Sequence, residues 1–183
     1  MSELIICDIQ IHGKEYWRGM FNLSEIIRYM EEFDHTLIFF NGEDLEMDTL
    51  EGMKDFYIDH GMTDELEEKT WFVEKSYGFF RDLIDQDWCN DDIIKLYHEM
   101  QKQSVTDSRD LDLEALPENF QEELAGGRLA IFEPVWNIDS EFIVKYFNPC
   151  TLIGGSQVAC LREIELFFQA HNVEYIKNQR FIF

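Results

Sequence analysis

Short apolar segments alternate with longer amphipathic segments along the chain of 183 residues. Most of the apolar segments are near-continuous runs of Val, Ile, Leu and Phe. This pattern is typical of strands that are covered on both faces, as in a parallel sheet. We therefore expect about six strands, at residues 4–11, 36–42, 70–75, 128–134, 151–155 and within 173–183.

The segments between these runs have the periodicity of amphipathic helices. One helix is expected over 23–33, with Asn22 or Ser24 as its N-cap. The other helices are expected over 47–61 with Gly61 as a C-cap, 91–101 after Asn90 or Asp91, 117–127, 140–147, and 157–171 after Ser156.

Strands that alternate with helices predict βαβ units and a parallel sheet with helices on both faces. The expected fold is one α/β domain over residues 1–183, a three-layer αβα, Rossmann-like arrangement around a mainly parallel sheet. Residues around 103–116 lack a clear periodicity, so we expect an irregular insertion there.

The formal net charge of −23, from 15 Lys and Arg against 38 Asp and Glu, narrows the choice of partners. Such a surface repels nucleic acid and anionic membranes, so neither is expected to bind directly. Two interpretations are open. The acidic residues form an ordinary solvated surface, or they mimic the phosphates of DNA and occupy a basic cleft on a protein partner.

The cysteine and histidine patterns limit which cofactors and which cellular compartment are expected. The four cysteines form no C-x-x-C pair, and the chain has neither an apolar run of about 20 residues nor a signal-peptide pattern at its start. A cytoplasmic protein with reduced thiols is therefore expected. The five histidines are isolated and no G-x-G-x-x-G motif occurs, so we expect no metal and no cofactor.

Reactive side chains fall where the predicted strands end, which is where doubly wound sheets place their sites. Asp8 lies in the first apolar run, where a carboxylate must be paired or functional. The alternatives for Asp8 are an edge position or a structural pair with an arginine. Lys75 ends the third run and can point into a crevice, unless it faces solvent beside Glu74.

Cys160 follows the fifth run and the Gly154-Gly155 pair, in the first turn of a predicted helix. The partial positive charge of a helix N-terminus favours a thiolate, and the unpaired amides there can bind an oxyanion. Cys160 is accordingly a candidate nucleophile, with an adjacent carboxylate to take the thiol proton. The alternative is a buried, inert cysteine.

These three places resemble the isochorismatase-like cysteine hydrolases, the superfamily that includes the nicotinamidases. The family has D-x-Q at the end of its first strand, and here ICDIQ supplies Asp8 and Gln10. It has a glycine six residues before a cysteine that begins a helix, as Gly154 and Cys160 are spaced here. It also has a lysine followed by an aromatic residue, a small residue and Phe, and here EKSYGFF supplies Lys75, Tyr77, Gly78 and Phe79.

The resemblance implies a catalytic triad of Asp8, Lys75 and Cys160, acting on a small amide or a related small molecule. In the family the cysteine attacks a carbonyl or related carbon, the aspartate relays the proton, and the lysine helps to activate the thiol. A cis peptide bond just before the cysteine orients an oxyanion hole, here the amides of Ala159 and Cys160. The implied pocket residues are Gln10, Tyr77, Phe79, Gly154 and Gly155.

Several positions depart from the family's pattern. Gln157-Val158 stands in place of a Thr-Asp pair, and Arg162-Glu163-Ile164 in place of a small, threonine-containing turn. The Asp-His-His metal site of the nicotinamidases is missing from the corresponding stretch, NGEDLEMD, and the region 103–134 lengthens the segment before the cysteine. A catalytically inactive fold relative is therefore a further interpretation, working as a scaffold or as a homo-oligomer through Phe-rich segments such as RFIF.

Overall fold

The fold is described from a computed structural model that covers residues 2–10, 22–41, 49–75, 79–104, 111–116, 118, 120–121 and 140–183. Its strands are β1 (Glu3–Cys7), β2 (His35–Phe40), β3 (Thr70–Glu74), β4 (Cys150–Gly154) and β5 (Tyr175–Lys177). Its helices are α2 (Leu23–Met30), α3 (Leu50–Asp59), α4 (Asp64–Glu68), α5 (Phe79–Asp85), α6 (Asn90–Gln103), α8 (Ser140–Tyr146) and α9 (Cys160–His171), with short 3-10 turns η2 (Leu113–Ala115) and η3 (Gln179–Phe181).

The five strands form one parallel sheet in the order β3-β2-β1-β4-β5. The predicted α/β fold with a parallel sheet is therefore confirmed. Five of the six predicted strands are present within a few residues of their expected positions. The sixth, over 128–134, lies outside the described residues.

The residues of the central strands alternate between two hydrophobic cores. In β1, Ile5 and Cys7 belong to the core that includes α5, α6, α8 and α9, whereas Leu4 and Ile6 belong to the core that includes α2, α3 and α4. This alternation follows from the two-residue period of a strand. Because both faces are covered, every residue of β1 is buried, which explains the continuous apolar run over residues 4–7.

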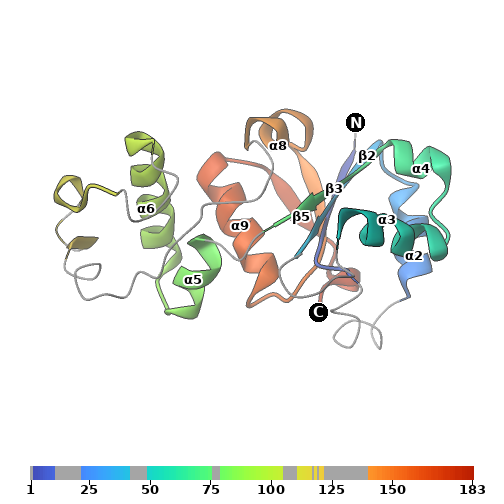
Figure 1. Ribbon diagram of the computed structural model, residues 1–183, viewed down its shortest axis with the longest axis horizontal. Helices are drawn as coiled ribbons and strands as arrows, with labels where there is room; N and C mark the ends of the chain where they lie inside the picture. The colour runs from blue at the N-terminus through green and yellow to red at the C-terminus, as the bar shows by residue number, and fades with distance from the viewer. Residues whose placement is uncertain are drawn as a thin grey trace.

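Figure 1 shows α2 and α3 on one side of the sheet and α9 on the other, with α6 on the far side of α9. The helix α6 therefore packs against α9 and adds a further layer to the three-layer arrangement. Of the predicted irregular insertion around 103–116, the structure describes the end of α6 at Gln103 and the turn η2, whereas residues 105–110 lie outside the described residues. Among the described helices, none is long and apolar enough to cross a membrane.

Helix ends follow local capping chemistry at two of the four predicted positions. Asn22 caps α2 by accepting a hydrogen bond from the Ser24 amide, and Gly61 follows α3 with a φ of 111°. The predictions for α6 and α9 were wrong in detail, because their N-caps are Cys89 and Ala159, neither of which caps with its side chain. The short helix α4, with Thr63 as its cap, was not predicted.

The glycine pair at the end of β4 allows that strand to approach β1 closely. Gly154 and Gly155 have φ angles of 78° and 66°, in the region that favours glycine. A Cβ atom at Gly154 would lie 2.2 Å from the carbonyl oxygen of Cys7, and one at Gly155 would lie 2.9 Å from the Cys7 sulfur. Both glycines are therefore required where the chain leaves β4 toward α9.

We predict that Gly154→Ala lowers the free energy of unfolding by about 2–4 kcal/mol, because the new methyl group meets backbone atoms of β1 in a strained conformation. Gly61→Ala is the matched control, since Gly61 also has a positive φ but nothing lies within 4 Å of a Cβ there. It should cost only about 1–2 kcal/mol, for backbone strain alone. Urea unfolding measures both, and equal losses would contradict the close-approach explanation.

Candidate functional site

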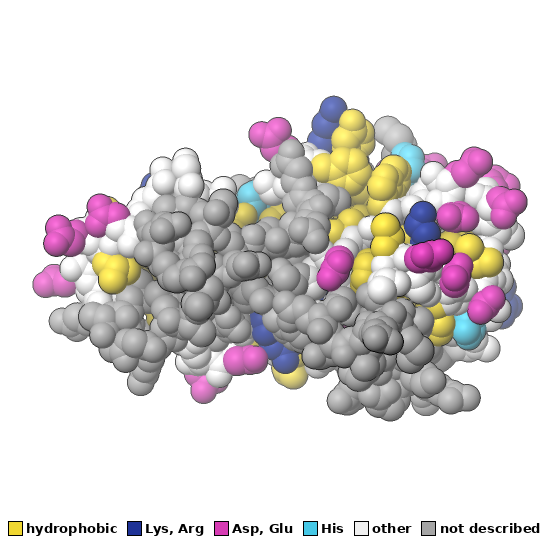
Figure 2. Space-filling view, viewed as in Figure 1, with side chains coloured by type: hydrophobic (Ala, Val, Ile, Leu, Met, Phe, Trp, Pro, Cys, Tyr) yellow, Lys and Arg dark blue, Asp and Glu magenta, His cyan; other side chains and the backbone are white. Residues whose placement is uncertain are grey.

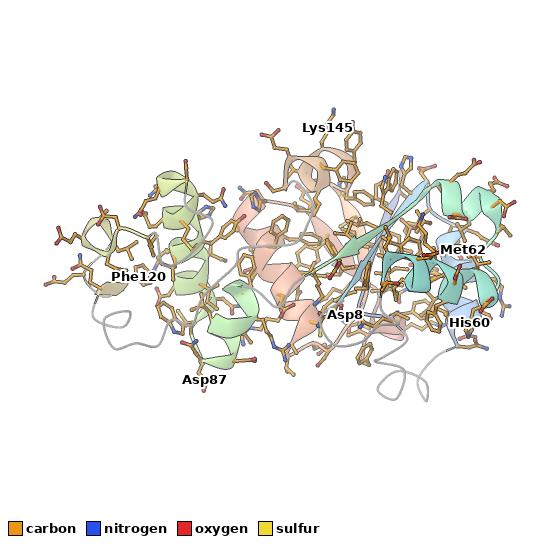
Figure 3. The ribbon with its side chains drawn as sticks, in the orientation of Figure 1. Asp8, His60, Met62, Asp87, Phe120 and Lys145 are labelled. Carbon is orange, nitrogen blue, oxygen red and sulfur yellow. The ribbon has the colours of Figure 1, made fainter. Side chains whose placement is uncertain are left out.

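The carboxyl ends of β1 and β4 meet at the point where the strand order reverses. β1 pairs with β2 on one side and with β4 on the other, and the chain crosses from β1 to β2 first. In open parallel sheets this switch point is the usual location of a ligand site. Asp8 directly follows β1, Gly154 ends β4, and Figure 3 labels Asp8 at that edge of the sheet, beside α9.

The backbone of Asp8 directs its side chain toward α9. Strict alternation would place Asp8 on the face of Leu4 and Ile6, but its φ of 49° is left-handed and breaks the alternation. Aspartate tolerates this conformation better than most residues, at a cost of about 1 kcal/mol. A hydrogen bond from the Asp8 amide to the Phe39 carbonyl, 2.9 Å long, holds the turn against β2.

Lys75 reaches Asp8 from the end of β3. Its amide donates to the Phe40 carbonyl at 2.7 Å, and its Nζ atom lies 2.7 Å from Asp8 Oδ2. Lys75 is only 3% exposed, so the solvent-facing alternative is excluded. Burial lowers the pKa of this ammonium group, but the charges of Asp8 and Glu163 outweigh it, and the net pKa is raised well above its usual value.

Glu163 is the second partner of Lys75, and sequence reasoning missed it. Its Oε2 atom accepts a hydrogen bond from Lys75 Nζ at 2.9 Å, and its side chain is buried more deeply than that of Asp8. Burial raises the pKa of the Glu163 carboxyl group, and the nearby lysine opposes that shift. The available signal was helix spacing, because Glu163 is three residues after Cys160 and therefore lies on the same face of α9.

Arg81 on α5 completes the charged cluster. Its Nη1 atom lies 3.9 Å from Glu163 Oε1, while its Nε atom donates to Asp85 at 3.0 Å. The site thus contains two buried carboxylates, one buried ammonium group and one half-buried guanidinium group. Within the described part of the chain, Asp8 Oδ1 and Glu163 Oε1 are buried acceptors without a hydrogen-bond partner.

Cys160 begins α9 beside this cluster and is partly buried. Burial, followed by the negative charge of Asp8, raises the pKa of its thiol to about 12, while Lys75 acts in the opposite direction. The group is therefore a thiol at neutral pH in the unliganded protein. The structure places Asp8, Lys75 and Cys160 near one another at one edge of the sheet.

The amides at the start of α9 differ in their availability. The Ala159 amide donates to the Ser156 carbonyl at 3.1 Å, as does the Leu161 amide at 3.0 Å. Among the described residues, none accepts a hydrogen bond from the Cys160 amide. Of the two predicted oxyanion donors, Cys160 is therefore available in this conformation and Ala159 is already used.

The cis peptide bond before Cys160, which the family resemblance implies, is not found. The cis peptide bond within the described residues is Asn148–Pro149, at the start of β4, and the bond before Cys160 is not cis. The loop instead has an unusual backbone at Ala159, with φ −131° and ψ −101°. Hydrogen bonds from Gln157 to the Phe183 carbonyl and from Phe183 to the Gly155 carbonyl, each 3.2 Å, fix this loop against the C-terminal segment.

The remaining predicted pocket residues have other placements. Gln10 is buried and uses both ends of its amide on the backbone of Asn41, at 2.7 and 3.0 Å, so it fixes the segment after β2. Phe79 is the first residue of α5. Tyr77 lies outside the described residues, as do most of the NGEDLEMD positions. In the described ranges, no group of three or more His, Cys, Asp or Glu is placed to hold a metal ion.

No protein-family model, no curated protein and no solved structure matches this chain. The α/β fold with a five-stranded parallel sheet is therefore established by the structure itself.

We predict that Lys75→Met lowers the free energy of unfolding by about 3–5 kcal/mol at pH 7, because two carboxylates stay buried without a cation. This loss of unfolding free energy should become smaller as the pH is lowered from 7 to 5. The Glu163 carboxyl group, whose pKa is already raised, loses the charge that opposed the rise, so the folded variant binds a proton more tightly than the unfolded chain.

Lys54→Met is the matched control for this prediction. Lys54 also contacts a glutamate, Glu67 at 3.6 Å, but its side chain is 41% exposed against 4% for Lys75. Its loss should change stability by less than about 1 kcal/mol. Urea unfolding at several pH values measures both variants. A Lys75→Met deficit as small as that of the control, or one that is constant with pH, would contradict the ion-pair assignment.

Proposed function

We propose that this protein is a cysteine hydrolase that acts on a small amide or a related carbonyl compound, with Cys160 as the nucleophile. The observation that supports this proposal is the buried Asp8–Lys75 ion pair beside a cysteine, at the switch point of a parallel sheet. A nucleophile, a carboxylate that can take its proton and a group that fixes the carboxylate are the parts that such catalysis needs.

In the first half of the reaction, the Cys160 sulfur attacks the carbonyl carbon while its proton passes to Asp8. Asp8 Oδ2 is held by Lys75, which leaves Oδ1 to accept that proton. The carbonyl electrons move to the oxygen, and the Cys160 amide and the start of α9 stabilise the resulting negative charge. The intermediate then expels the amine, which takes the proton from Asp8, and a thioester to Cys160 remains.

In the second half, water replaces the amine. Asp8 accepts a proton from the water as its oxygen attacks the thioester carbonyl carbon. The tetrahedral intermediate collapses, the carbon–sulfur bond breaks, and the proton returns to the sulfur. The products are a carboxylic acid and the original thiol. Lys75 stays charged throughout and compensates the negative charge of Asp8 whenever Asp8 is ionised.

The raised pKa of the thiol fits proton transfer during the attack. With a thiol pKa of about 12, the thiolate is a very small fraction of the protein at pH 7. A general base that removes the proton as the carbon–sulfur bond forms avoids that penalty. The depth of Lys75 and Glu163 favours a small substrate, because little of the cluster is exposed to solvent.

We predict that Cys160→Ser lowers the hydrolysis of a panel of small primary amides by at least about 10³-fold, and that Asp8→Asn lowers it by about 10²-fold or more. Cys89→Ser is the control and should keep full activity, because Cys89 is exposed at the start of α6. Released ammonia gives the rate, and the intact mass of quenched reactions reveals the thioester. Full activity of Cys160→Ser, or a panel with neither turnover nor an adduct on Cys160, contradicts the proposal.

A second candidate function is favoured by the distribution of exposed acid groups. Figure 2 shows acidic side chains gathered at the end of the molecule that carries α4. The exposed carboxylates there include Glu51, Asp55, Asp59, Asp64, Glu65 and Glu68. Together with the net charge of −23, this surface supports binding to a basic protein partner without catalysis.

We predict for this second function that immobilised protein retains basic, nucleic-acid-binding proteins at about 50 mM salt and releases them by about 500 mM, since screening removes the attraction. Neutralising Asp64, Glu65 and Glu68 to their amides should reduce the retention, whereas Cys160→Ser should not change it. Retention that is indifferent to salt, or equal for both variants, contradicts the acidic-surface function.

A further inference from the structure

We propose that Glu163 is a positioning residue that keeps the Lys75 ammonium group away from the Cys160 sulfur and so, together with burial and Asp8, keeps the nucleophile a thiol until substrate binds. The consequence for catalysis rests on the proposed function. The effect on the thiol does not, because it can be measured on the protein without any substrate.

The geometry gives Lys75 two competing partners. Its Nζ atom lies 2.7 Å from Asp8 Oδ2 and 2.9 Å from Glu163 Oε2, so two of its three N–H donors are directed at carboxylates. Cys160 and Glu163 are three residues apart on α9 and face the same cluster. Because Glu163, one turn along α9, holds Lys75, the ammonium group is less available to the sulfur of Cys160 at the start of that helix.

The ionisable groups around the sulfur come from four elements. Cys7 and Asp8 lie at the end of β1, Lys75 follows β3, Arg81 extends from α5, and Glu163 shares α9 with Cys160. Lys75 is the cation that lowers the pKa of the Cys160 thiol, and Asp8 and Glu163 both raise it. Arg81 is directed mainly to Asp85, at 3.0 Å, and only approaches Glu163, at 3.9 Å. Glu163 therefore adds to the larger effects of burial and of Asp8, which already favour the protonated sulfur.

Glu163 is also held incompletely, which is unusual for a buried carboxylate. Oε2 bonds Lys75, but Oε1 is buried with no hydrogen-bond partner in the described part of the chain. A structural carboxylate at this depth normally satisfies both oxygens, since an unpaired buried acceptor costs free energy. The Arg81 guanidinium lies 3.9 Å from Oε1, so Lys75 is the direct hydrogen-bond partner of this carboxylate.

The test is the alkylation rate of Cys160 by iodoacetamide between pH 7 and pH 10, with the labelled residue identified by peptide mass spectrometry. Glu163→Gln keeps the shape and an acceptor for Lys75 but removes the negative charge. We expect its Cys160 rate at pH 8 to be roughly tenfold above that of the unmodified protein, which corresponds to about one unit in the thiol pKa.

Glu165→Gln is the matched control, because it removes the same charge from the same helix. Glu165 pairs with Lys177 at 2.8 Å and with the Tyr175 hydroxyl at 2.9 Å, away from Lys75. Its Cys160 rate and pH profile should stay within about twofold of the unmodified protein. An unchanged rate in Glu163→Gln, or an equal rise in both variants, overturns the proposal.

Circular dichroism and thermal unfolding establish that each variant is folded before it is labelled. If Glu163→Gln does not fold, Glu163→Asp is measured instead. It withdraws the carboxylate from Lys75 by one methylene, so it should raise the Cys160 rate by a smaller factor, and an unchanged rate overturns the proposal. A raised alkylation rate without amide hydrolysis in any variant would sustain the role of Glu163 while contradicting the hydrolase function.

Discussion

A buried ammonium group between two buried carboxylates is the constraint on which the rest of the site depends. At 3% exposure the Lys75 ammonium group is compensated by Asp8 and Glu163, and removal of Lys75 would leave both carboxylates buried without a neighbouring ammonium group. Asp8 follows β1, Lys75 follows β3, and Glu163 lies on α9. The ion pairs between them therefore fix the position of α9 relative to the edge of the sheet. Cys160 begins the same helix and is placed by the same contacts.

The parallel sheet and the glycine pair make this convergence geometrically feasible. With the order β3-β2-β1-β4-β5, the carboxyl ends of all strands lie at one edge, so residues that are far apart in sequence meet there. Gly154 and Gly155 let β4 end directly against Cys7, and the chain then turns into α9 within a few residues. The left-handed backbone at Asp8 turns its carboxylate to the α9 side. Each of these local features is conformationally unfavourable on its own, and each helps to position the charged cluster.

The sequence allowed the sheet, most of the helices and the neighbourhood of Asp8, Lys75 and Cys160 to be predicted, because continuous apolar runs report burial on both faces. Glu163 could not be found in this way. A glutamate in an amphipathic helix usually faces solvent, and only the position of Lys75 in space makes it a buried partner. The caps of α6 and α9 were misplaced because no side chain caps those helices.

The expectation that RFIF exposes apolar surface also differs from the structure. Phe181 is buried against Tyr29 on α2, with ring centroids 5.1 Å apart, and Ile182 and Phe183 are partly buried. The C-terminal segment instead hydrogen-bonds the loop between β4 and α9. From the sequence alone, this segment is expected to expose apolar side chains. The helix that covers it, α2, is about 150 residues away in the chain, so no local sequence pattern indicates its burial.

A double-mutant cycle between Asp8 and Lys75 tests the central claim most directly. The free energies of unfolding of Asp8→Asn, Lys75→Met and the double variant give the coupling between the two side chains. We predict a coupling of at least about 2 kcal/mol at pH 7, since each charge left alone is buried without compensation. Losses that add to within about 0.5 kcal/mol would contradict the claim that this ion pair organises the site.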